Sequence, residues 1–442
     1  MSTQIAMNCA TDANNCSDNS AKLGQLSECL LKLNSLWQVK AFDCQQLPWS
    51  EQFPCLAAKV WAIADTDIEA LDVAQGALVS ALLPSLMQDM QQLGMKIDGL
   101  AAMLSTSTNG DVSLTRPEPK SFEAHAVEIG LSDTELSHFS AHIKGRKWQQ
   151  ITAFSAHIPK GNPIVEWCAG KGHLGRYIAK THQVKVSSLE WQQSLCEQGQ
   201  QFADKWQLSQ QFHCVDVFNL ANSTLGANPL SSEQHAIALH ACGDLHVRLL
   251  ELAAQANTKQ ISFSPCCYHL IQANYYQPLS HAAKNSGLKL SRHDLQLPLQ
   301  QSVIANDKQQ ALRHQEIAWR LGFDSLQRDI SGNDRYLPIP SVKRSQLSAS
   351  FSDFCYWAGA QKQVNIGAVT DFDAYLAQGV ARQRLTQRID LVAHLFRHAL
   401  EQWLLLDRMC FLQQQGYQVT MVEFCANEIT PRNWLIQAEK LT

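Results

Sequence analysis

The chain has 442 residues, which is too long for one ordinary hydrophobic core, so two or three domains are expected. Hydrophobic residues make up 45% and charged residues 17% of the chain, a composition that excludes global disorder. The net charge of −4 argues against a protein that coats nucleic acid by overall charge, and it leaves room for a local basic patch.

The cysteines indicate a reducing compartment. They are scattered singly except for the adjacent pair Cys266 and Cys267, and no C-x-x-C pair or zinc-ribbon spacing occurs, so no metal is expected. The first residues, "MSTQIAMNCATDANNCSDNS", lack an apolar signal core. No apolar run approaches the ~18–20 residues that span a bilayer. The sequence therefore predicts a cytoplasmic protein with free thiols and no membrane segment.

Residues 1–104 are expected to form an N-terminal helical domain. Apolar residues recur at helical spacing at its start, namely Leu23, Leu26, Leu30, Leu33 and Trp37. This segment carries no catalytic motif, so an accessory role, with docking of a protein partner, is expected. Residues 105–121 are rich in Ser, Thr, Gly, Asn and Pro, which predicts a linker.

Residues 122–300 have the pattern of an α/β domain. The motif Ser132-x-x-Glu135 predicts a capped helix start. Short apolar strands are expected at residues 164–168, 184–189, 212–218, 236–241 and 261–264, with helices near 173–182, 192–206 and 247–256. Such alternation predicts a mostly parallel sheet with helices on both faces. Ligands bind such sheets at the carboxyl ends of the strands.

Residues 301–442 are expected to form a helical extension. A strand is a candidate at residues 288–297, just before it, and one long helix is expected over residues 381–415, with Gly416 as its stop. The stretch after Gly416 predicts a strand that returns to the sheet, a turn at Thr430–Pro431 and a short final segment.

The stretch Pro163–Tyr177, "PIVEWCAGKGHLGRY", places Gly170, Gly172 and Gly175 in a G-x-G-x-x-G spacing. A triphosphate-binding P-loop is excluded, because the lysine stands between two glycines and no hydroxyl follows it. A dinucleotide loop fits the glycines, but Glu166 at the strand end would face a pyrophosphate, which is electrostatically unfavourable. The glutamate suits S-adenosylmethionine, which has no phosphate and carries an ammonium and a sulfonium.

Acidic residues also end the next two expected strands. Glu190 follows the glycine loop by ~20 residues, where a carboxylate can accept both ribose hydroxyls. Trp191 comes next and offers a ring to stack on adenine. Asp216, in "FHCVDVF", is placed to accept the adenine amino group. Three acids at three successive strand ends favour a nucleoside-containing cofactor.

The segments "VEWCAGKGHLG", "LE" and "VDV" resemble the class I S-adenosylmethionine-dependent methyltransferases. This resemblance implies a Rossmann-like α/β core and S-adenosylmethionine as the cofactor. Cys168 departs from the usual pattern, which has glycine there, and a cysteine restricts the backbone. The residues expected to contact the cofactor are Glu166, Ala169, Gly170, Gly172, Glu190, Trp191, Asp216 and His240.

Two further segments narrow the resemblance. "LHACGDL" (Leu239–Leu245) and "SPCCYH" (Ser264–His269) resemble a methyltransferase family that includes the glutathione S-transferase C-terminal-domain-containing protein. The closing "ITPRNWLI" is similar to the end of that group, and a more distant likeness is to the eukaryotic tRNA 2′-O-methyltransferases. The resemblance covers roughly Lys144–Leu270 and a short tail. It implies methyl transfer to RNA, with tRNA as a candidate; a protein or small-molecule acceptor, or a non-catalytic binding module, stays open.

The same two segments are expected to converge into a reaction centre, because they follow neighbouring strands. Methyl transfer is an in-line displacement at the sulfonium, so the protein orients the nucleophile and takes its proton. The residues expected to be catalytic are Asp244, Cys266, Cys267 and His269.

Four chemistries stay open at this centre. Asp244 or His269 can act as the base for a ribose hydroxyl, or a cysteine can attack C6 of a pyrimidine. Zinc held by Cys242, Cys266, Cys267 and His269 is disfavoured, because adjacent ligands are sterically awkward. The thiols can also serve only as small apolar residues that shape the pocket.

Two groups of basic residues can each be interpreted in two ways, one before the first expected strand and one in the helical extension. Gly145–Trp148, "GRKW", fits either a phosphate or cofactor-carboxylate contact or a solvated helix end. Arg382, Arg384 and Arg388 lie on the expected late helix, and a solvated helix face is favoured over an RNA contact.

Overall fold

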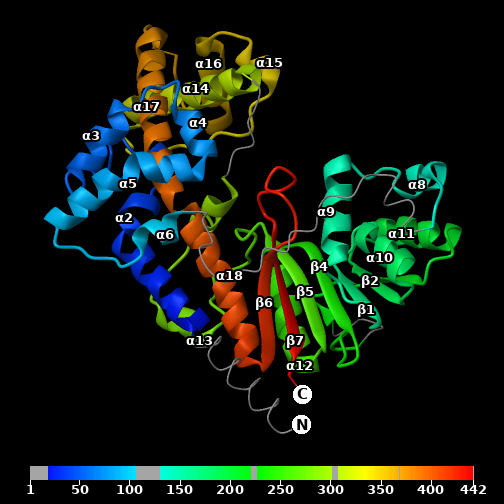
Figure 1. Cartoon of the computed structure of the whole chain (residues 1–442). Coiled ribbons are helices and arrows are strands. Elements are labelled where there is room, and N and C mark those ends of the chain that lie inside the picture. The colour runs from blue at the N-terminus through cyan, green and yellow to red at the C-terminus, as the bar shows by residue number, and fades with distance from the viewer. Residues whose placement is uncertain (1–17, 106–129, 221–225, 301–306, 368, 442) are drawn as a thin grey trace. The chain divides into compact units, whose positions relative to one another are not determined.

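The computed structural model describes residues 18–105, 130–220, 226–300, 307–367 and 369–441. The chain divides into two compact units (Figure 1). Unit 1 comprises residues 1–27, 108–299 and 401–442, and unit 2 comprises residues 28–107 and 300–400. Most of the N-terminal helices and most of the later helices thus belong to unit 2. The sequence predicted them in two separate regions, residues 1–104 and 301–442. The predicted linker, apart from Ser105, lies outside the described residues.

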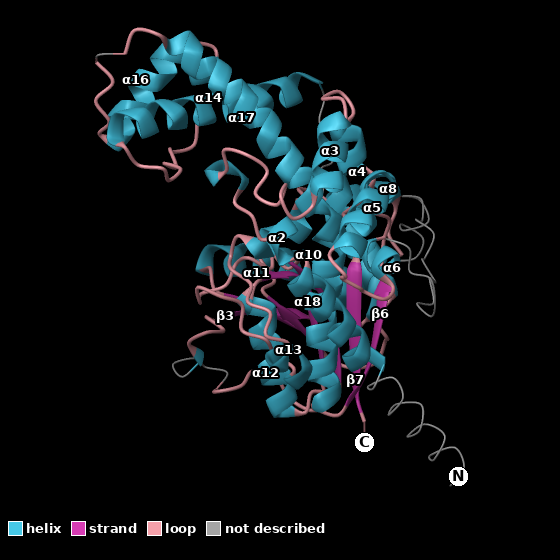
Figure 2. Ribbon diagram, turned by 90° about the vertical axis from the view of Figure 1, so that its left-hand side faces the viewer, coloured by secondary structure: helices cyan, strands magenta, loops and turns pink. Residues whose placement is uncertain are grey.

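Unit 1 is built on a seven-stranded sheet of order β3-β2-β1-β4-β5-β7-β6. Its strands are β1 (Ile164–Trp167), β2 (Val186–Glu190), β3 (Gln210–Cys214), β4 (His235–Cys242), β5 (Gln260–Cys266), β6 (Tyr417–Glu423) and β7 (Trp434–Lys440). The first five are parallel, and β7 runs antiparallel to both β5 and β6. Figure 2 shows the strands in magenta and the helices in cyan. The five parallel strands and the late strand that returns to the sheet are confirmed.

Helices cover both faces of this sheet. They are α8 (Asp133–Phe139), α9 (Gly145–Ala156), α10 (His173–His182), α11 (Gln193–Lys205), α12 (Asp244–Ala256), α13 (His281–Asn285) and the later part of α18 (Arg397–Gln414). Helices α9 and α10 share a hydrophobic core with Ile164, Val186 and Ile237. On the opposite face, His246 of α12 stacks on Phe263 of β5. All four residues of β1 are buried, as expected of a central parallel strand covered on both sides.

The predicted helix start at Ser132 is confirmed in detail. The Ser132 hydroxyl accepts the Glu135 N–H at 3.3 Å, and the Ser132 N–H donates to the Glu135 carboxylate at 2.9 Å. These reciprocal bonds satisfy two backbone donors that a helix start otherwise leaves without partners.

Unit 2 is helical in its described residues. A helix covers residues 18–32 and crosses the unit boundary, and later elements are α2 (Asn34–Trp37), η1 (Ala41–Asp43), α3 (Pro54–Ala62), α4 (Ile68–Val73), α5 (Gln75–Gln92), α6 (Leu100–Leu104), α14 (Asp307–Ser331), α15 (Arg344–Leu347), α16 (Phe351–Lys362), α17 (Phe372–Ala393) and η4 (His394–Phe396). Helix α17 packs along α14 and contacts α3 and α4. Among the described residues, no helix is both long and apolar enough to cross a bilayer.

Two predicted elements are wrong. The single helix over residues 381–415 is two helices, because the 3₁₀ turn η4 separates α17 from α18. Instead of a strand at residues 288–297, Ser291 makes one bridge to Tyr275 and a 3₁₀ helix, η3 (Asp294–Leu299), follows. Pro298 lies within η3, and a proline has no N–H to donate to a strand ladder.

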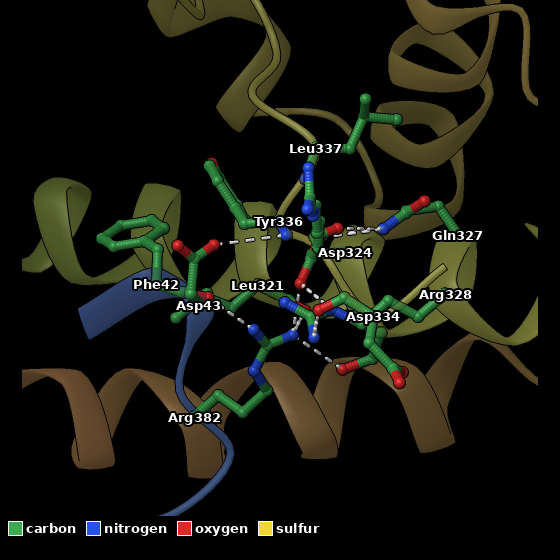
Figure 3. A network of polar contacts seen from close by, with 12 residues as sticks. Phe42, Asp43, Leu321, Asp324, Gln327, Arg328, Asp334, Tyr336, Leu337 and Arg382 are labelled. Carbon is green, nitrogen blue, oxygen red and sulfur yellow. Dashed lines mark hydrogen bonds and ion pairs between the residues drawn. The ribbon is translucent and has the colours of Figure 1, made fainter. Parts of the chain in front are cut away.

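Two of the three arginines expected on a solvated helix face, Arg382 and Arg388 of α17, are instead buried in unit 2, and Figure 3 shows Arg382 among its polar contacts. The buried Asp324 carboxylate accepts hydrogen bonds from Arg328 at 2.7 Å and from Arg382 at 2.8 Å. Arg388 is also buried and pairs with Asp65 at 2.6 Å. Arg384 alone of the three matches the expected exposure. Losing one partner of such a buried pair leaves an uncompensated charge, so these residues are structural.

Candidate functional site

The glycine loop between β1 and α10 closes tightly against the sheet. Cys168, Gly170 and Gly172 all have a positive φ, of 56°, 58° and 64°. A Cβ on Gly172 would lie 2.3 Å from the Phe212 ring, and one on Gly175 would lie 2.4 Å from a Glu166 oxygen. A Cβ on Gly170 would meet nothing within 4 Å. Gly172 and Gly175 are therefore required for inward packing, whereas Gly170 borders open space where a ligand can approach the backbone.

Glu166 lies beneath this loop. It is 4% exposed, and its carboxylate accepts the Gly175 N–H at 3.0 Å and the Ser188 hydroxyl at 2.7 Å. The Gln210 amide donates to Ser188 at 2.9 Å and to the Gly172 carbonyl at 3.2 Å. Burial raises the pKa of Glu166 to about 7. The carboxylate thus supports the loop from inside the protein, and its direct contact with the cofactor stays a prediction.

The ends of β2 and β3 form the second part of the cradle. The Glu190 carboxylate accepts the N–H groups of Gly170 at 2.9 Å and of Gln192 at 3.0 Å. Trp191 beside it is 67% exposed. The exposed Asp216 uses one carboxylate oxygen to accept the Phe218 N–H at 3.0 Å. Each ionised carboxylate has further acceptor positions, so these groups fit the hydroxyls and amino group of a nucleoside.

Ala169 and His240 complete the predicted cofactor contacts. The Ala169 N–H donates to the Leu189 carbonyl at 2.9 Å, which fixes the loop to the end of β2. His240 stands at the end of β4 with a φ of 70°, and its Nε2 contacts the Gln150 amide oxygen at 2.6 Å. Their contact with the cofactor, like that of the other cradle residues, stays a prediction.

The ends of β4 and β5 are fastened to each other. The register shifts between Leu239 and Cys242, and a Cβ on Gly243 would lie 1.9 Å from the Leu270 carbonyl oxygen. The Asp244 N–H donates to that carbonyl at 3.1 Å, and the Asp244 carboxylate accepts the Gln272 N–H at 2.7 Å. These contacts hold the segment after β4 against the segment after β5, so the two predicted motifs do converge.

Three thiols meet at this junction. The sulfur atoms of Cys242 and Cys266 are 3.2 Å apart, and those of Cys242, Cys266 and Cys267 all lie within 4.8 Å of one another. The contact with Cys266, then the contact with Cys267 and the charge of Arg432, lower the pKa of Cys242 to about 6, against an opposing effect of burial. The same contact raises the pKa of Cys266. One of the coupled thiols is therefore easier to ionise than a free cysteine.

The residues after Cys267 face different ways. The Tyr268 hydroxyl is buried and donates to the Glu401 carboxylate at 3.3 Å. His269 is half-buried, and its Nδ1 is buried without a hydrogen-bond partner among the described residues. An unpaired buried nitrogen is costly, and the described residues supply no partner for it; the catalytic role of His269 stays a prediction.

A buried network supports the β4 end from α18. Arg408 is 1% exposed and donates from Nε to His246 Nε2 at 2.7 Å, and His246 Nδ1 donates to the Ala241 carbonyl at 3.1 Å. Sequence reasoning missed Glu401 and Arg408. A signal was present, because both are charged residues within an otherwise apolar helical stretch.

Two cations lie at the same edge of the sheet. Desolvation lowers the pKa of His240 to about 4, and the charges of Lys147 and Arg432 act on its ring in the same direction. Neither side chain makes a hydrogen bond or ion pair with another described residue. Lys147 belongs to the predicted basic cluster, whereas Arg432 was quoted only within the closing segment.

The comparisons with known proteins agree with this geometry. Residues 146–274, less than a third of the chain, match the family model described as "Methyltransferase domain". The similar solved structures include the tRNA (uracil-54, C5)-methyltransferase of Pyrococcus abyssi in complex with S-adenosyl-L-homocysteine, at 16% identity over 27% of this chain and 29% of that chain, with a TM-score of 0.22.

Two more solved structures are similar over short stretches. An rRNA methylase from Streptococcus thermophilus is 12% identical over 28% of this chain and 74% of that chain, with a TM-score of 0.22. A TehB-like S-adenosylmethionine-dependent methyltransferase from Corynebacterium glutamicum is 14% identical over 32% of this chain and 72% of that chain, with a TM-score of 0.22.

Identities and TM-scores this low do not classify the domain. Its class is established by the family match, together with the sheet and the glycine loop. Unit 1 contains a Rossmann-like methyltransferase domain. The domain is of the methyltransferase class, whose cofactor is S-adenosylmethionine, and the activity of the whole protein is taken up below as a proposal. The open space beside Gly170 and the exposed Trp191 fit that cofactor.

Proposed function

We propose that this methyltransferase acts on RNA, with tRNA as the first candidate, in the cytoplasm. The observation that carries the proposal is the pair of cations, Lys147 and Arg432, beside His240 at the carboxyl ends of the strands. Positive side chains that make no hydrogen bond or ion pair with another described residue are suited to phosphate groups, and phosphate contacts supply most of the affinity for nucleic acid. The likeness of "HACGDL", "SPCCYH" and "ITPRNWLI" to the family described above, and more distantly to tRNA 2′-O-methyltransferases, supports the same acceptor.

The residues divide into a donor side and an acceptor side. Bound S-adenosylmethionine supplies a methyl group on a sulfonium. On the donor side, Gly170 gives access to the loop backbone, Glu190 and Asp216 offer acceptors for hydroxyl and amino groups, and Trp191 offers a stacking surface. On the acceptor side, Lys147 and Arg432 bind the phosphates that flank the acceptor nucleotide.

His269 is the group best placed to take the proton of an attacking hydroxyl. Its Nδ1 is buried without a hydrogen-bond partner among the described residues, and the ring as a whole is half-buried, so Nε2 is the nitrogen that we propose takes the proton. Asp244 keeps the two loops together through its bond to the Gln272 N–H, and its second oxygen can orient the acceptor. Cys266 and Cys267, whose sulfur atoms lie together with that of Cys242, line the site next to Asp244 and His269 in this proposal.

Methyl transfer from labelled S-adenosylmethionine tests the proposal. The acceptors are bulk tRNA and total RNA from a strain that lacks the gene, with protein extract of the same strain as a second arm. The proposal expects label in RNA, and less label at the same RNA concentration in the Lys147→Ala, Arg432→Ala double variant. Label confined to protein or to small molecules, or none despite cofactor binding, would reject the RNA acceptor.

A further inference from the structure

We propose that Cys242, Cys266 and Cys267 bind one thiophilic divalent metal ion, zinc by its chemistry, and leave one coordination position open for an exogenous ligand. The site goes beyond the proposed acceptor and reverses the sequence-based expectation of no metal, which relied on the spacing of the cysteines. Three sulfur atoms within 4.8 Å of one another, drawn from two neighbouring strand ends, carry the proposal.

The distances suit a tetrahedral ion. With zinc–sulfur bonds of about 2.3 Å, two sulfurs of one tetrahedron are about 3.8 Å apart. The Cys242–Cys266 distance of 3.2 Å and the 4.8 Å limit for the whole group lie on either side of that value. Small side-chain rotations would therefore place all three sulfurs around one centre.

The backbone at Cys267 indicates why the adjacent cysteines do not point apart. Successive side chains of a strand normally face opposite sides of the sheet, so Cys266 and Cys267 should diverge. Cys267 instead has a φ of 35°, which turns its sulfur toward the other two. Such a conformation is costly for a residue other than glycine and persists where the surroundings enforce it. This turn removes the steric objection to adjacent ligands.

A disulfide explains less of the same geometry. A disulfide bond between Cys242 and Cys266 would use two sulfurs and would not account for the positive φ of Cys267. Simple packing also fails to explain it, because Cys242 and Cys267 are only half-buried and need no inward turn to avoid water. A metal ion uses all three sulfurs at once.

The charge around the three thiols and the contacts between their two loops both favour metal binding. Three thiols release their protons to solvent as one dication binds, which leaves a net charge of about −1 on the centre. Arg432 lies near enough for its positive charge to act on both Cys242 and Cys267. The fastening of Gly243 and Asp244 to Leu270 already holds the two loops together, so little ordering is needed on binding. Three protein ligands and one open position are typical of zinc sites that bind a substrate or water.

Metal content measures the proposal independently of methyl transfer. The full chain is purified without a metal-affinity tag or chelator, under reducing conditions, and analysed by inductively coupled plasma mass spectrometry. We expect one zinc per chain, with at least a fivefold loss in Cys242→Ser and in Cys267→Ser. Cys214→Ser, which changes an exposed thiol on β3, serves as the matched control and should keep its zinc.

A second measurement needs no variant. The metal-free full chain is titrated with Co²⁺, and a thiolate-to-cobalt charge-transfer band with tetrahedral d–d bands is expected at one equivalent. A wild-type protein that takes up neither Zn²⁺ nor Co²⁺, that forms a Cys242–Cys266 disulfide in place of binding, or that loses no metal in the two serine variants would overturn the site. Metal without methyl transfer to RNA would reject only the proposed acceptor, and RNA methylation without metal would reject only the metal site.

Discussion

The backbone N–H of Gly170 donates to the Glu190 carboxylate at 2.9 Å, and this bond joins the glycine loop to the end of β2. The same carboxylate lies at the end of β2, where the contact with the cofactor ribose is expected. Glu190→Ala should weaken S-adenosylmethionine binding about tenfold to hundredfold, because a hydrogen bond to a charged group contributes ~1.5–3 kcal/mol. Isothermal titration calorimetry measures the loss, with Glu197→Ala on α11 as the control. Equal affinities for the two variants would contradict the assignment.

Gly170 and Gly172 give a matched pair of substitutions, since both have a positive φ but different surroundings. Gly172→Ala should lower the free energy of unfolding by about 2–4 kcal/mol, from the left-handed backbone and the collision with Phe212. Gly170→Ala should cost only about 1–2 kcal/mol, because its Cβ meets nothing, yet it should weaken cofactor binding. Urea unfolding and calorimetry on both variants separate these effects. A smaller destabilisation at Gly172 than at Gly170 would be inconsistent with the packing described.

Glu166 should make stability fall as pH rises. Its folded-state pKa is raised to about 7 from an ordinary 4.5 by burial, so between these values the unfolded chain loses the proton that the folded chain keeps. The contribution is fully present below pH ~4.5, is lost up to pH ~7 and amounts to about 3 kcal/mol at most.

Glu166→Gln isolates this effect from the other acids. A glutamine can accept the Gly175 N–H and donate to Ser188, so the variant should fold and lose this part of the pH dependence. The free energy of unfolding, measured in urea between pH 4.5 and 8, should therefore favour the variant increasingly as pH rises. A constant difference between the two proteins across that range would show that Glu166 does not titrate as described.

Removing either cation should weaken RNA binding uniformly across sequences. Each lost phosphate contact should reduce the slope of log affinity against log salt by about 0.7–0.9. Filter binding of tRNA by Lys147→Ala and by Arg432→Ala over a range of salt measures this slope. Lys205→Ala, which changes an exposed cation on α11, is the control. An unchanged slope in both variants would remove these residues from the RNA interface.

The sequence predicted the sheet well because its signals are local. Apolar runs such as "IVEW" bounded by loops identify buried parallel strands, and the capping box at Ser132 identifies a helix start. The break between α17 and α18 was missed, since apolar residues continue through His394–Phe396 and no proline or glycine marks the turn. The candidate strand at residues 288–297 was wrong because apolar residues at alternate positions also suit the 3₁₀ helix η3 and the single bridge from Ser291 to Tyr275.

The sequence predicted which residues meet at the candidate site better than it predicted what each of them contacts. Strand ends predicted that Cys242 and Cys266 would meet, and they do. The inward position of Glu166 was not predictable, because it depends on Ser188 of another strand and on Gly175 in the first turn of α10. The turned backbone at Cys267 and the support from Arg408 depend on tertiary contacts, which spacing along the chain does not encode.

Transfer of a labelled methyl group from S-adenosylmethionine to RNA of a deletion strain tests the central claim most directly. The wild-type protein should label RNA, His269→Ala should lose turnover while it keeps cofactor affinity, and the Lys147→Ala, Arg432→Ala double variant should raise the RNA concentration needed. Cofactor binding with no label in any RNA fraction, or with equal RNA labelling by all these variants, would contradict the account.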